Sequence, residues 1–225
     1  MRGFFAGLLA FTFLPGPALA DEGAKAEINR PYLVDTDVER WKKGFENEGR
    51  EVYAKREQIV AAAGVKPGIA VADIGAGTGL FTMLFAKAVK PGGRVYAVDI
   101  STAFIDEIKK TAKAQGLDNV TAVLADGTGV GLADASVDLA YLSDVYHHFE
   151  RPAQTLAAIR SAIKPGGRMV VIDYERIPGT TPPSRVAHLR LDKATALREI
   201  EAAGFTLLEE KKLMQENYFA VFLRP

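Results

Sequence analysis

The sequence contains no cysteine, only three histidines and no formal net charge. The lack of cysteine excludes a disulfide scaffold, thiol catalysis and thiolate ligation of a metal. Because 28 basic residues balance 28 acidic ones, the chain has no basic field for nucleic acid. With so few histidines, the sequence predicts no metal site. The length of 225 residues suits one globular domain with a substantial core.

The first twenty residues have the pattern of a secretory signal peptide. Arg2 gives a positive start, and residues 3–14 form an apolar stretch that is too short to cross a bilayer comfortably. The run Ala18-Leu19-Ala20 matches a cleavage site, and no cysteine follows it. We therefore expect cleavage after Ala20 and a periplasmic or secreted protein whose only membrane contact is this signal. An uncleaved anchor or a wrongly assigned start codon is the alternative. Residues 21–37 predict a linker or N-terminal arm.

A glycine-rich stretch at residues 73–79 organises the rest of the chain. The apolar run over 69–72 predicts a short buried strand, Asp73 follows it, and three glycines at alternate positions precede an apolar pattern with helical spacing. The stretch therefore predicts a strand, a tight turn and a helix. Glycine allows the sharp turn and the close approach of a ligand. The first N–H groups of the helix remain available to a polar ligand.

The order of these residues, D-x-G-x-G-x-G, resembles motif I of the class I (Rossmann-like) S-adenosylmethionine-dependent methyltransferases. A dinucleotide fingerprint has the spacing G-x-G-x-x-G instead. A glycine turn that serves only packing is the structural alternative. The resemblance implies S-adenosyl-L-methionine as the cofactor. It also implies a cofactor site that includes Asp73, Gly75, Ala76, Gly77, Thr78 and Gly79.

Two further acids follow predicted strands. Asp99 ends a strand over 94–98 and lies about 20–25 residues beyond the glycine stretch, the separation expected for a carboxylate that accepts both ribose hydroxyls. Asp126 follows a strand over 120–124, where the resemblance implies a bond to the adenine amino group. A solvated acid at a strand end or in a turn is the alternative in each case. The same pocket is expected to include the residue after each acid, Ile100 and Gly127.

Residues 38–63 predict a largely helical segment that two glycines interrupt. In the family that the motif resembles, a helix at this place covers the cofactor pocket. The equal alternative is a helix that packs its aromatic side chains on the sheet and leaves its charges in solvent. If the resemblance holds, contacts to the cofactor or the substrate are expected from Glu46, Arg50 and Tyr53, of which Tyr53 is assigned to the cofactor.

A strand predicted over 139–142 ends in the run S-D-V-Y-H-H-F at residues 143–149. In a doubly wound sheet the first and fourth strands flank the point at which strand order reverses, and ligands bind there. The run is similar to the H-H-[FL] ending of the same methyltransferases, with His148 at the matching position. We therefore assign Ser143 to the cofactor. The polar side chains expected opposite the glycine stretch, near the transferable methyl group, are Asp144, Tyr146, His147 and His148.

The histidine pair suggests a general base. In this hypothesis His148 or His147 removes a proton from the acceptor, and Asp144 orients the imidazole. Adjacent histidines on an irregular segment are expected to point in different directions, one into the pocket and one into the packing. A purely structural role for both rings is the alternative.

The rest of the pattern predicts an α/β fold. The expected elements are a helix from 151 to about 163, a strand over 168–173, an irregular stretch over 174–190, a helix over 192–203, and strands over 205–212 and 218–223. We expect a doubly wound, mostly parallel seven-stranded sheet with a C-terminal antiparallel strand, in three α/β/α layers, with the domain spanning 38–225. His188, in the irregular stretch, is either a solvated residue or a substrate contact or base.

The resemblance implies a methyltransferase that moves a methyl group from S-adenosyl-L-methionine to a small molecule, a lipid or an exported protein by in-line displacement. Three alternatives remain open. They are a non-catalytic S-adenosylmethionine-binding module, a nicotinamide-dependent oxidoreductase and an aminopropyl transferase of the same fold. The glycine spacing and the terminal pair of strands count against the oxidoreductase.

Overall fold

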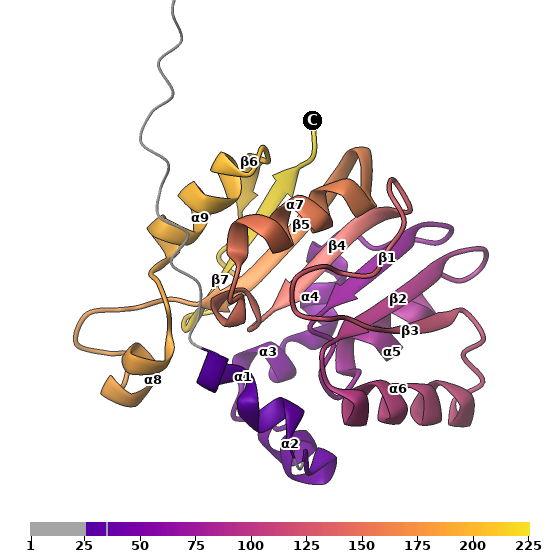
Figure 1. Cartoon of the computed structure of the whole chain (residues 1–225), viewed down its shortest axis with the longest axis horizontal. Coiled ribbons are helices and arrows are strands. Elements are labelled where there is room, and N and C mark those ends of the chain that lie inside the picture. The colour runs from indigo at the N-terminus through magenta and orange to yellow at the C-terminus, as the bar shows by residue number, and fades with distance from the viewer. Residues whose placement is uncertain (1–25, 35) are drawn as a thin grey trace, which may run out of the picture.

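One mixed sheet forms the centre of the molecule. The computed structural model describes residues 26–34 and 36–225, and within them seven strands pair in the order β3-β2-β1-β4-β5-β7-β6 (Figure 1). Strand β7 is antiparallel to both neighbours, and the other pairs are parallel. The predicted doubly wound, mostly parallel sheet is therefore confirmed. The strands are β1 (Ala70–Ile74), β2 (Arg94–Asp99), β3 (Val120–Leu124), β4 (Val137–Ser143), β5 (Ile163–Tyr174), β6 (Thr206–Glu210) and β7 (Asn217–Leu223).

Helices cover both faces of this sheet. They are α1 (Ala26–Leu33), α2 (Val38–Phe45), α3 (Glu51–Ala54), α4 (Arg56–Ala62), α5 (Leu80–Ala88), α6 (Thr102–Ala114), α7 (Pro152–Ala162), α8 (Pro183–His188) and α9 (Lys193–Ala202), with a 3₁₀ turn η1 (Tyr146–His148). Helices α4, α5 and α6 share one apolar core with the sheet, and α7 and α9 share the other. Helices α1, α2 and α8 gather at the edge where the parallel strands end (Figure 1).

The central strands are apolar on both faces because both faces are covered. In β1, Val71 packs into the core beneath α5, whereas Ala72 and Ile74 pack into the core beneath α7 and α9. In β4, Leu139 packs into the core beneath α5, and Leu142 packs into the core beneath α7 and α9. This two-sided burial fixes the register of the strands, so their ends are held in fixed positions at one edge of the sheet.

A crevice opens between the ends of β1 and β4. These two strands are direct neighbours, but the chain leaves β1 toward α5 on one face and leaves β4 toward α7 on the other. The two connections therefore diverge. At the mouth of the crevice Gly75 has φ +69°, and a Cβ on it would lie 2.3 Å from Cγ2 of Val145. The close approach of the two connections thus depends on a glycine.

Several element boundaries differ from the predicted ones. The segment 38–63 divides into three helices with a break at residues 46–50, and the stretch expected to be irregular contains α8. Strand β5 begins earlier than predicted because Ile163 pairs with Val137 across an irregularity in the register. The segment expected to be a linker or arm contains α1. The predicted signal peptide lies outside the described residues, and among those described no helix is long and apolar enough to span a membrane.

Replacing Gly75 tests the close approach of β1 and β4. Gly75→Ala introduces a strained backbone and a steric overlap with Val145, so it should lower the free energy of unfolding by roughly 1–2 kcal/mol for strain and about 1–3 kcal/mol more for overpacking. Gly116→Ala is the matched control, because Gly116 has φ +64° and a Cβ on it would have no neighbouring atom within 4 Å. Urea unfolding of both variants measures the difference. Equal losses would contradict the steric argument.

A buried acid in β1 gives the fold a pH dependence. Asp73 is 3% exposed, and the Thr82 hydroxyl donates to its Oδ2 at 2.6 Å. Burial raises the pKa of Asp73 from 3.8 to about 7, although the Thr82 hydroxyl opposes the shift. The folded state therefore holds this proton more tightly than the unfolded state. The contribution of Asp73 to stability is complete below the unfolded pKa and is lost as the pH rises through the folded one.

Asp73→Asn should remove this dependence, because the amide cannot ionise and still accepts from Thr82. We expect the variant to gain stability relative to the wild type between pH 5 and 8, by roughly 3 kcal/mol at about 1.4 kcal/mol per pKa unit. Urea unfolding across this range measures it. Asp106→Asn, at a side chain that is 67% exposed, is the control whose offset should stay constant. A constant offset for Asp73→Asn as well would disprove the assignment.

Candidate active site

A cavity of about 970 Å³ lies at the edge where β1, β2, β4 and β5 end. Its walls come from the glycine stretch, from the segment after β3, from η1, and from α1, α2 and α8. Most of the predicted site residues line it. They are Asp73, Gly75, Ala76, Gly77, Thr78, Asp99, Ile100, Asp126, Gly127, Ser143, Asp144, His147 and His148. Of the residues expected at the site, Glu46, Tyr53 and Gly79 do not line the cavity, and Tyr146 is buried outside its lining.

The glycine stretch forms one wall with its backbone. Gly75, Gly77 and Gly79 all have positive φ, at 69°, 53° and 84°. The N–H groups of Gly75 and Ala76 donate to the carbonyl of Val98 at 2.8 and 3.0 Å, so the turn is attached to the end of β2. Gly79 is the N-cap of α5 and contributes by setting the turn rather than by facing the cavity. The result is a flat peptide surface that a ligand can approach closely.

Asp99 stands where this wall meets β2. The residue is 7% exposed, and its two carboxylate oxygens accept from the N–H groups of Gly77 at 2.8 Å and Ser101 at 2.9 Å. Burial raises the pKa of Asp99, and these N–H donors oppose the rise. Each oxygen can accept a further hydrogen bond, so the carboxylate fits the two adjacent hydroxyls of a ribose.

Asp126 occupies an exposed turn at the far side of the cavity. Its Oδ1 accepts from the N–H and hydroxyl of Thr128, both at 2.8 Å, and from the N–H of Gly129 at 3.0 Å. The pKa of Asp126 is lowered to about 2, chiefly by the N–H groups of Gly129 and Thr128. The three bonds fix the loop over residues 125–129 and converge on one oxygen. Oδ2 is therefore the oxygen that an amino group from the cavity can reach.

The segment between α2 and α3 covers the glycine wall. The hydroxyl of Thr78 donates to Oε1 of Glu46 at 2.6 Å, and the ring of Phe45 lies 3.7 Å from a Cβ position built on Gly77. Trp41 stacks beside Phe45, with ring centroids 5.1 Å apart. Thr78 thus binds the cover with its side chain, while Phe45 and Trp41 face the cavity.

Tyr53, which the sequence assigns to the cofactor, points elsewhere. The guanidinium of Arg56 lies 4.2 Å from the centre of its ring, and the carbonyl of Tyr53 accepts from Arg56 at 2.7 Å. The assignment is corrected because α3 begins at Glu51 and turns Val52, which is 4% exposed, toward the core and the cavity. Adjacent helical residues lie about 100° apart, so Tyr53 falls on another face.

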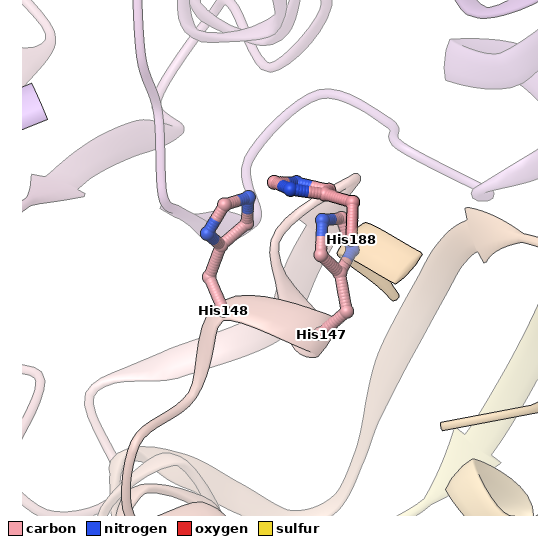
Figure 2. A group of neighbouring side chains, drawn as sticks. All are labelled: His147, His148 and His188. Carbon is pink, nitrogen blue, oxygen red and sulfur yellow. The ribbon is translucent and has the colours of Figure 1, made fainter. Parts of the chain in front are cut away.

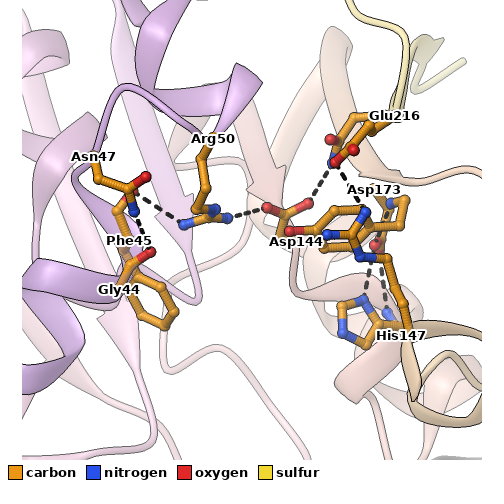
Figure 3. Close-up of polar contacts among 11 residues, drawn as sticks. Gly44, Phe45, Asn47, Arg50, Asp144, His147, Asp173 and Glu216 are labelled. Atoms are coloured by element: carbon orange, nitrogen blue, oxygen red, sulfur yellow. Dashed lines mark hydrogen bonds and ion pairs between the residues drawn. The ribbon is translucent and has the colours of Figure 1, made fainter. Parts of the chain in front are cut away.

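Asp144 forms an ion pair with the cover instead of orienting a histidine. Arg50 donates from Nη2 to Oδ2 of Asp144 and from Nη1 to the carbonyl of Phe45, while Asn217 donates to Oδ1 of Asp144 at 2.6 Å (Figure 3). Burial raises the pKa of Asp144 to about 6 against the opposing charge of Arg50. The predicted contact between Asp144 and an imidazole is therefore corrected. Asp144 connects β4 to the segment that covers the cavity.

The carboxylate that orients His147 is that of Asp173, at the end of β5. Nδ1–H of His147 donates to Oδ1 of Asp173 at 2.7 Å, and the backbone N–H of His147 donates to Oδ2 at 3.1 Å (Figure 3). Both residues are buried. Burial acts to lower the pKa of His147, but the charge of Asp173 outweighs it and raises that pKa. Because Asp173 engages Nδ1, Nε2 of His147 is the nitrogen that remains free.

His148 is held by a residue of α1. Nδ1–H of His148 lies 3.1 Å from Oδ1 of Asn29, and the amide of Asn29 donates to the carbonyl of His148 at 3.1 Å and to Glu150 at 2.9 Å. Burial lowers the pKa of His148 to about 3, and His147 and His188 lower it further. A group with this pKa is a weak base, so the general-base hypothesis for His148 loses support.

The two adjacent histidines face the same cavity, contrary to expectation. The centroids of the two rings are 4.2 Å apart, although adjacent residues of a 3₁₀ turn such as η1 project about 120° apart. His188 reaches them from α8, at 5.1 Å from His147 and 5.2 Å from His148 (Figure 2). The sequence predicts no metal site, yet one nitrogen from each of the three rings lies within 4.8 Å of the others.

Sequence reasoning overlooked two residues of this site. Asp173 is recognisable as an acid at the end of a predicted parallel strand, the same signal that identifies Asp99. Asn29 carries no such signal, because it lies in a polar segment that the sequence predicts to be a linker.

Comparison with known proteins finds similarity to methyltransferases over the central part of the chain. Residues 72–171 match the family model described as "Methyltransferase domain". The chain is 36% identical over 113 residues to an uncharacterized 37.1 kDa protein in transposon TN4556 of Streptomyces fradiae, covering 50% of this chain and 32% of that protein. It is 32% identical over 119 residues to the ubiquinone/menaquinone biosynthesis C-methyltransferase UbiE of Burkholderia cenocepacia, covering 52% and 48%. The chain thus spans a third to about half of the length of these relatives.

The fold agrees with solved structures as well. A SAM-dependent methyltransferase from Aquifex aeolicus superposes with a TM-score of 0.75 at 21% identity, covering 85% of this chain and all of that one. The matched residues 72–171 contain the glycine stretch, Asp99, Asp126 and the histidine pair after β4. Residues 72–171 thus match a methyltransferase domain, and the chain has the fold of a SAM-dependent methyltransferase of known structure.

Proposed function

We propose that the chain transfers a methyl group from S-adenosyl-L-methionine to a small-molecule or lipid acceptor. The observation that carries this proposal is the placement of Asp99. Its buried carboxylate accepts a hydrogen bond from the N–H of Gly77 in the glycine stretch. Both residues line a cavity that the histidine side chains also line. The cavity of about 970 Å³ is at the upper end of the roughly 300–1,000 Å³ typical of ligand sites, so it has room for a donor and an acceptor together.

The residues present fit the cofactor. Asp99 would accept the ribose hydroxyls, Oδ2 of Asp126 would accept from the adenine amino group, and the peptide surface at Gly75 and Gly77 would lie against the donor. Ser143 and Ile100 line the same part of the cavity. When bound, S-adenosyl-L-methionine supplies a methyl group on a sulfonium, which an N, O, S or C nucleophile attacks in line.

The protein's own contribution is to position the acceptor and to exclude water. Orientation of a reacting pair is worth effective molarities of roughly 10⁵ M or more, and residues of α1, α2 and the segment between α2 and α3 line one side of the cavity. Tyr32, Trp41 and Phe45 form a continuous aromatic wall, with ring centroids 4.7 and 5.1 Å apart. This wall supports an acceptor with an apolar body. The function in the name of the UbiE relative, C-methylation in ubiquinone and menaquinone biosynthesis, is compatible with such an acceptor.

Two other functions predict different results. A non-catalytic module would bind the same cofactor without transferring its methyl group, and a nicotinamide-dependent oxidoreductase would bind NADH in its place. Incubation of the chain with methyl-labelled S-adenosyl-L-methionine and fractionated envelope lipids or soluble metabolites distinguishes them. Label in a lipid or small-molecule fraction is the expected result. Binding of the cofactor without labelled product in any fraction would favour the non-catalytic module.

The leader pattern of residues 1–20 supports an exported location as part of the proposal. Cell fractionation together with mass measurement of the N-terminus tests it. A protein that starts at Asp21 in the periplasmic fraction is expected, whereas a cytoplasmic protein that retains Met1 would disprove export and would leave the proposed activity standing.

Asp99→Asn should weaken binding of S-adenosyl-L-methionine by roughly 10- to 100-fold. The amide retains one acceptor but loses the charge, and hydrogen bonds to charged groups contribute about 1.5–3 kcal/mol. Isothermal titration calorimetry measures the affinity. Asp106→Asn removes the same charge from the exposed surface of α6 and should leave the affinity unchanged. Equal affinities for Asp99→Asn and the wild type would contradict the assignment of Asp99 to the ribose.

A further inference from the structure

All three histidines of the chain meet in one place. The sequence contains three, and one nitrogen of each of His147, His148 and His188 lies within 4.8 Å of the other two (Figure 2). They come from two elements far apart in the sequence, η1 after β4 and α8 after β5. All three also line the cavity that contains the glycine wall.

Two of the rings are oriented by partners on the side away from the cluster. Asp173 holds Nδ1 of His147 at 2.7 Å, and its carboxylate is itself fixed by the backbone N–H groups of His147 and Tyr174. Asn29 holds Nδ1 of His148 at 3.1 Å. Each bond leaves Nε2 as the free nitrogen. Metal-bound histidines characteristically donate their other N–H to a carboxylate or carbonyl oxygen in this way.

The charges around the cluster suit a cation. Asp173 lies directly behind His147, and two nearby guanidinium groups are paired with acids. Arg185 pairs with Glu216 at 2.8 Å, and Arg190 pairs with Glu199 at 2.7 Å. The positive side chains of α8 and the following segment therefore have their charge compensated outside the cluster.

We propose that His147, His148 and His188 bind one divalent transition-metal ion, Zn²⁺ or an ion of similar ligand preference, with a further coordination position open to the cavity. Three imidazoles and one open position are the ligand set of a catalytic zinc site. In a tetrahedral site with Zn–N distances of 2.0–2.1 Å the nitrogens lie about 3.3 Å apart, so the cluster must contract slightly. His188 is exposed on the short helix α8, and its side chain can move without disturbing the core.

The open position gives the ion a role that rests on the proposed methyl transfer. An acceptor hydroxyl that binds a divalent ion loses its proton to solvent more readily. The electron pair of the resulting oxyanion forms the bond to the methyl carbon, directly or through a conjugated ring carbon, while the methyl–sulfur bond breaks and its pair stays on sulfur. The acceptor class is therefore an enol, a phenol or another acidic hydroxyl compound.

Metal binding is tested on the full chain purified without a polyhistidine tag and freed of metal with a chelator. Titration with Zn²⁺ by calorimetry, and with Co²⁺ by visible absorption, should show one equivalent bound with the spectrum of a nitrogen-ligated, low-coordinate ion. His188→Ala should weaken binding by roughly 10-fold or more, and Asp173→Asn by roughly 10- to 100-fold. Val186→Ala, on the same exposed helix, should bind as the wild type does.

The absence of one-equivalent binding, or equal affinities for the wild type and His188→Ala, would overturn the metal site. His188→Ala keeps the test decisive even where substitutions at the buried His147 impair folding.

Cofactor affinity is measured separately on the metal-free chain, so the two proposals fail independently. Methyl transfer that persists without metal would overturn the role of the ion and leave the methyltransferase standing. Specific metal binding without transfer to any acceptor would retain the site and count against the proposed function.

Discussion

Four carboxylates lie at one edge of the sheet, three of them buried and the fourth, that of Asp144, largely buried, and the partners of each one shape a part of the site. Asp73, Asp99, Asp144 and Asp173 are at or just beyond the ends of β1, β2, β4 and β5, which are consecutive in the sheet. An isolated buried charge is costly unless it is hydrogen-bonded, paired or protonated. Because four acids share one edge, each needs partners of its own, and the partners come from different parts of the chain.

The four solutions divide the site by function. Asp73 is compensated by a hydroxyl and a raised pKa, which keeps it inside the fold. Asp99 uses two backbone N–H groups and keeps capacity for a ligand. Asp144 recruits Arg50 from the N-terminal segment, and Asp173 recruits an imidazole. The first two acids thus build the glycine-walled half of the cavity, and the last two build the half next to the histidines.

The cover over the cavity follows from the same requirement. Helix α2 has no buried residue, so it is attached mainly by polar bonds. These are Lys42 to Glu107, Glu46 to Thr78, Arg50 to Asp144 and, from α1, Asn29 to His148. The pair of Lys42 with Glu107 is partly exposed and is of the kind that contributes about 0.2–1 kcal/mol, whereas the pair of Arg50 with Asp144 is largely buried and is costlier to break. The cover is therefore held chiefly where Arg50 meets Asp144 and where Asn29 meets His148.

Sequence reasoning succeeded where a feature is local. The strand, turn and helix around Gly75, and the acid that ends β2, depend on neighbouring residues and a fixed spacing, so both were predictable. The assignment of Tyr53 to the cofactor is wrong because the direction of its side chain depends on where α3 begins. A shift of one residue in that start changes the face of the helix on which each side chain lies. The contact between Asn29 and His148 joins residues 119 positions apart. The sequence pattern of neither segment indicates this contact. It also does not indicate that His188 lies beside His147 and His148.

This difference explains why the glycine-walled half of the cavity is recognisable from the sequence and the surroundings of the histidines are not. The family match spans residues 72–171, which include the glycine stretch, Asp99 and Asp126. Asn29 and Arg50 precede that span, and Asp173 and His188 follow it. A cofactor common to a family constrains the residues that touch it, whereas an acceptor that differs between members constrains residues beyond the shared core. The groups that orient His147 and His148, and the third imidazole, therefore lie where resemblance to the family gives no guidance. Their chemistry has to be read from the arrangement of the side chains themselves.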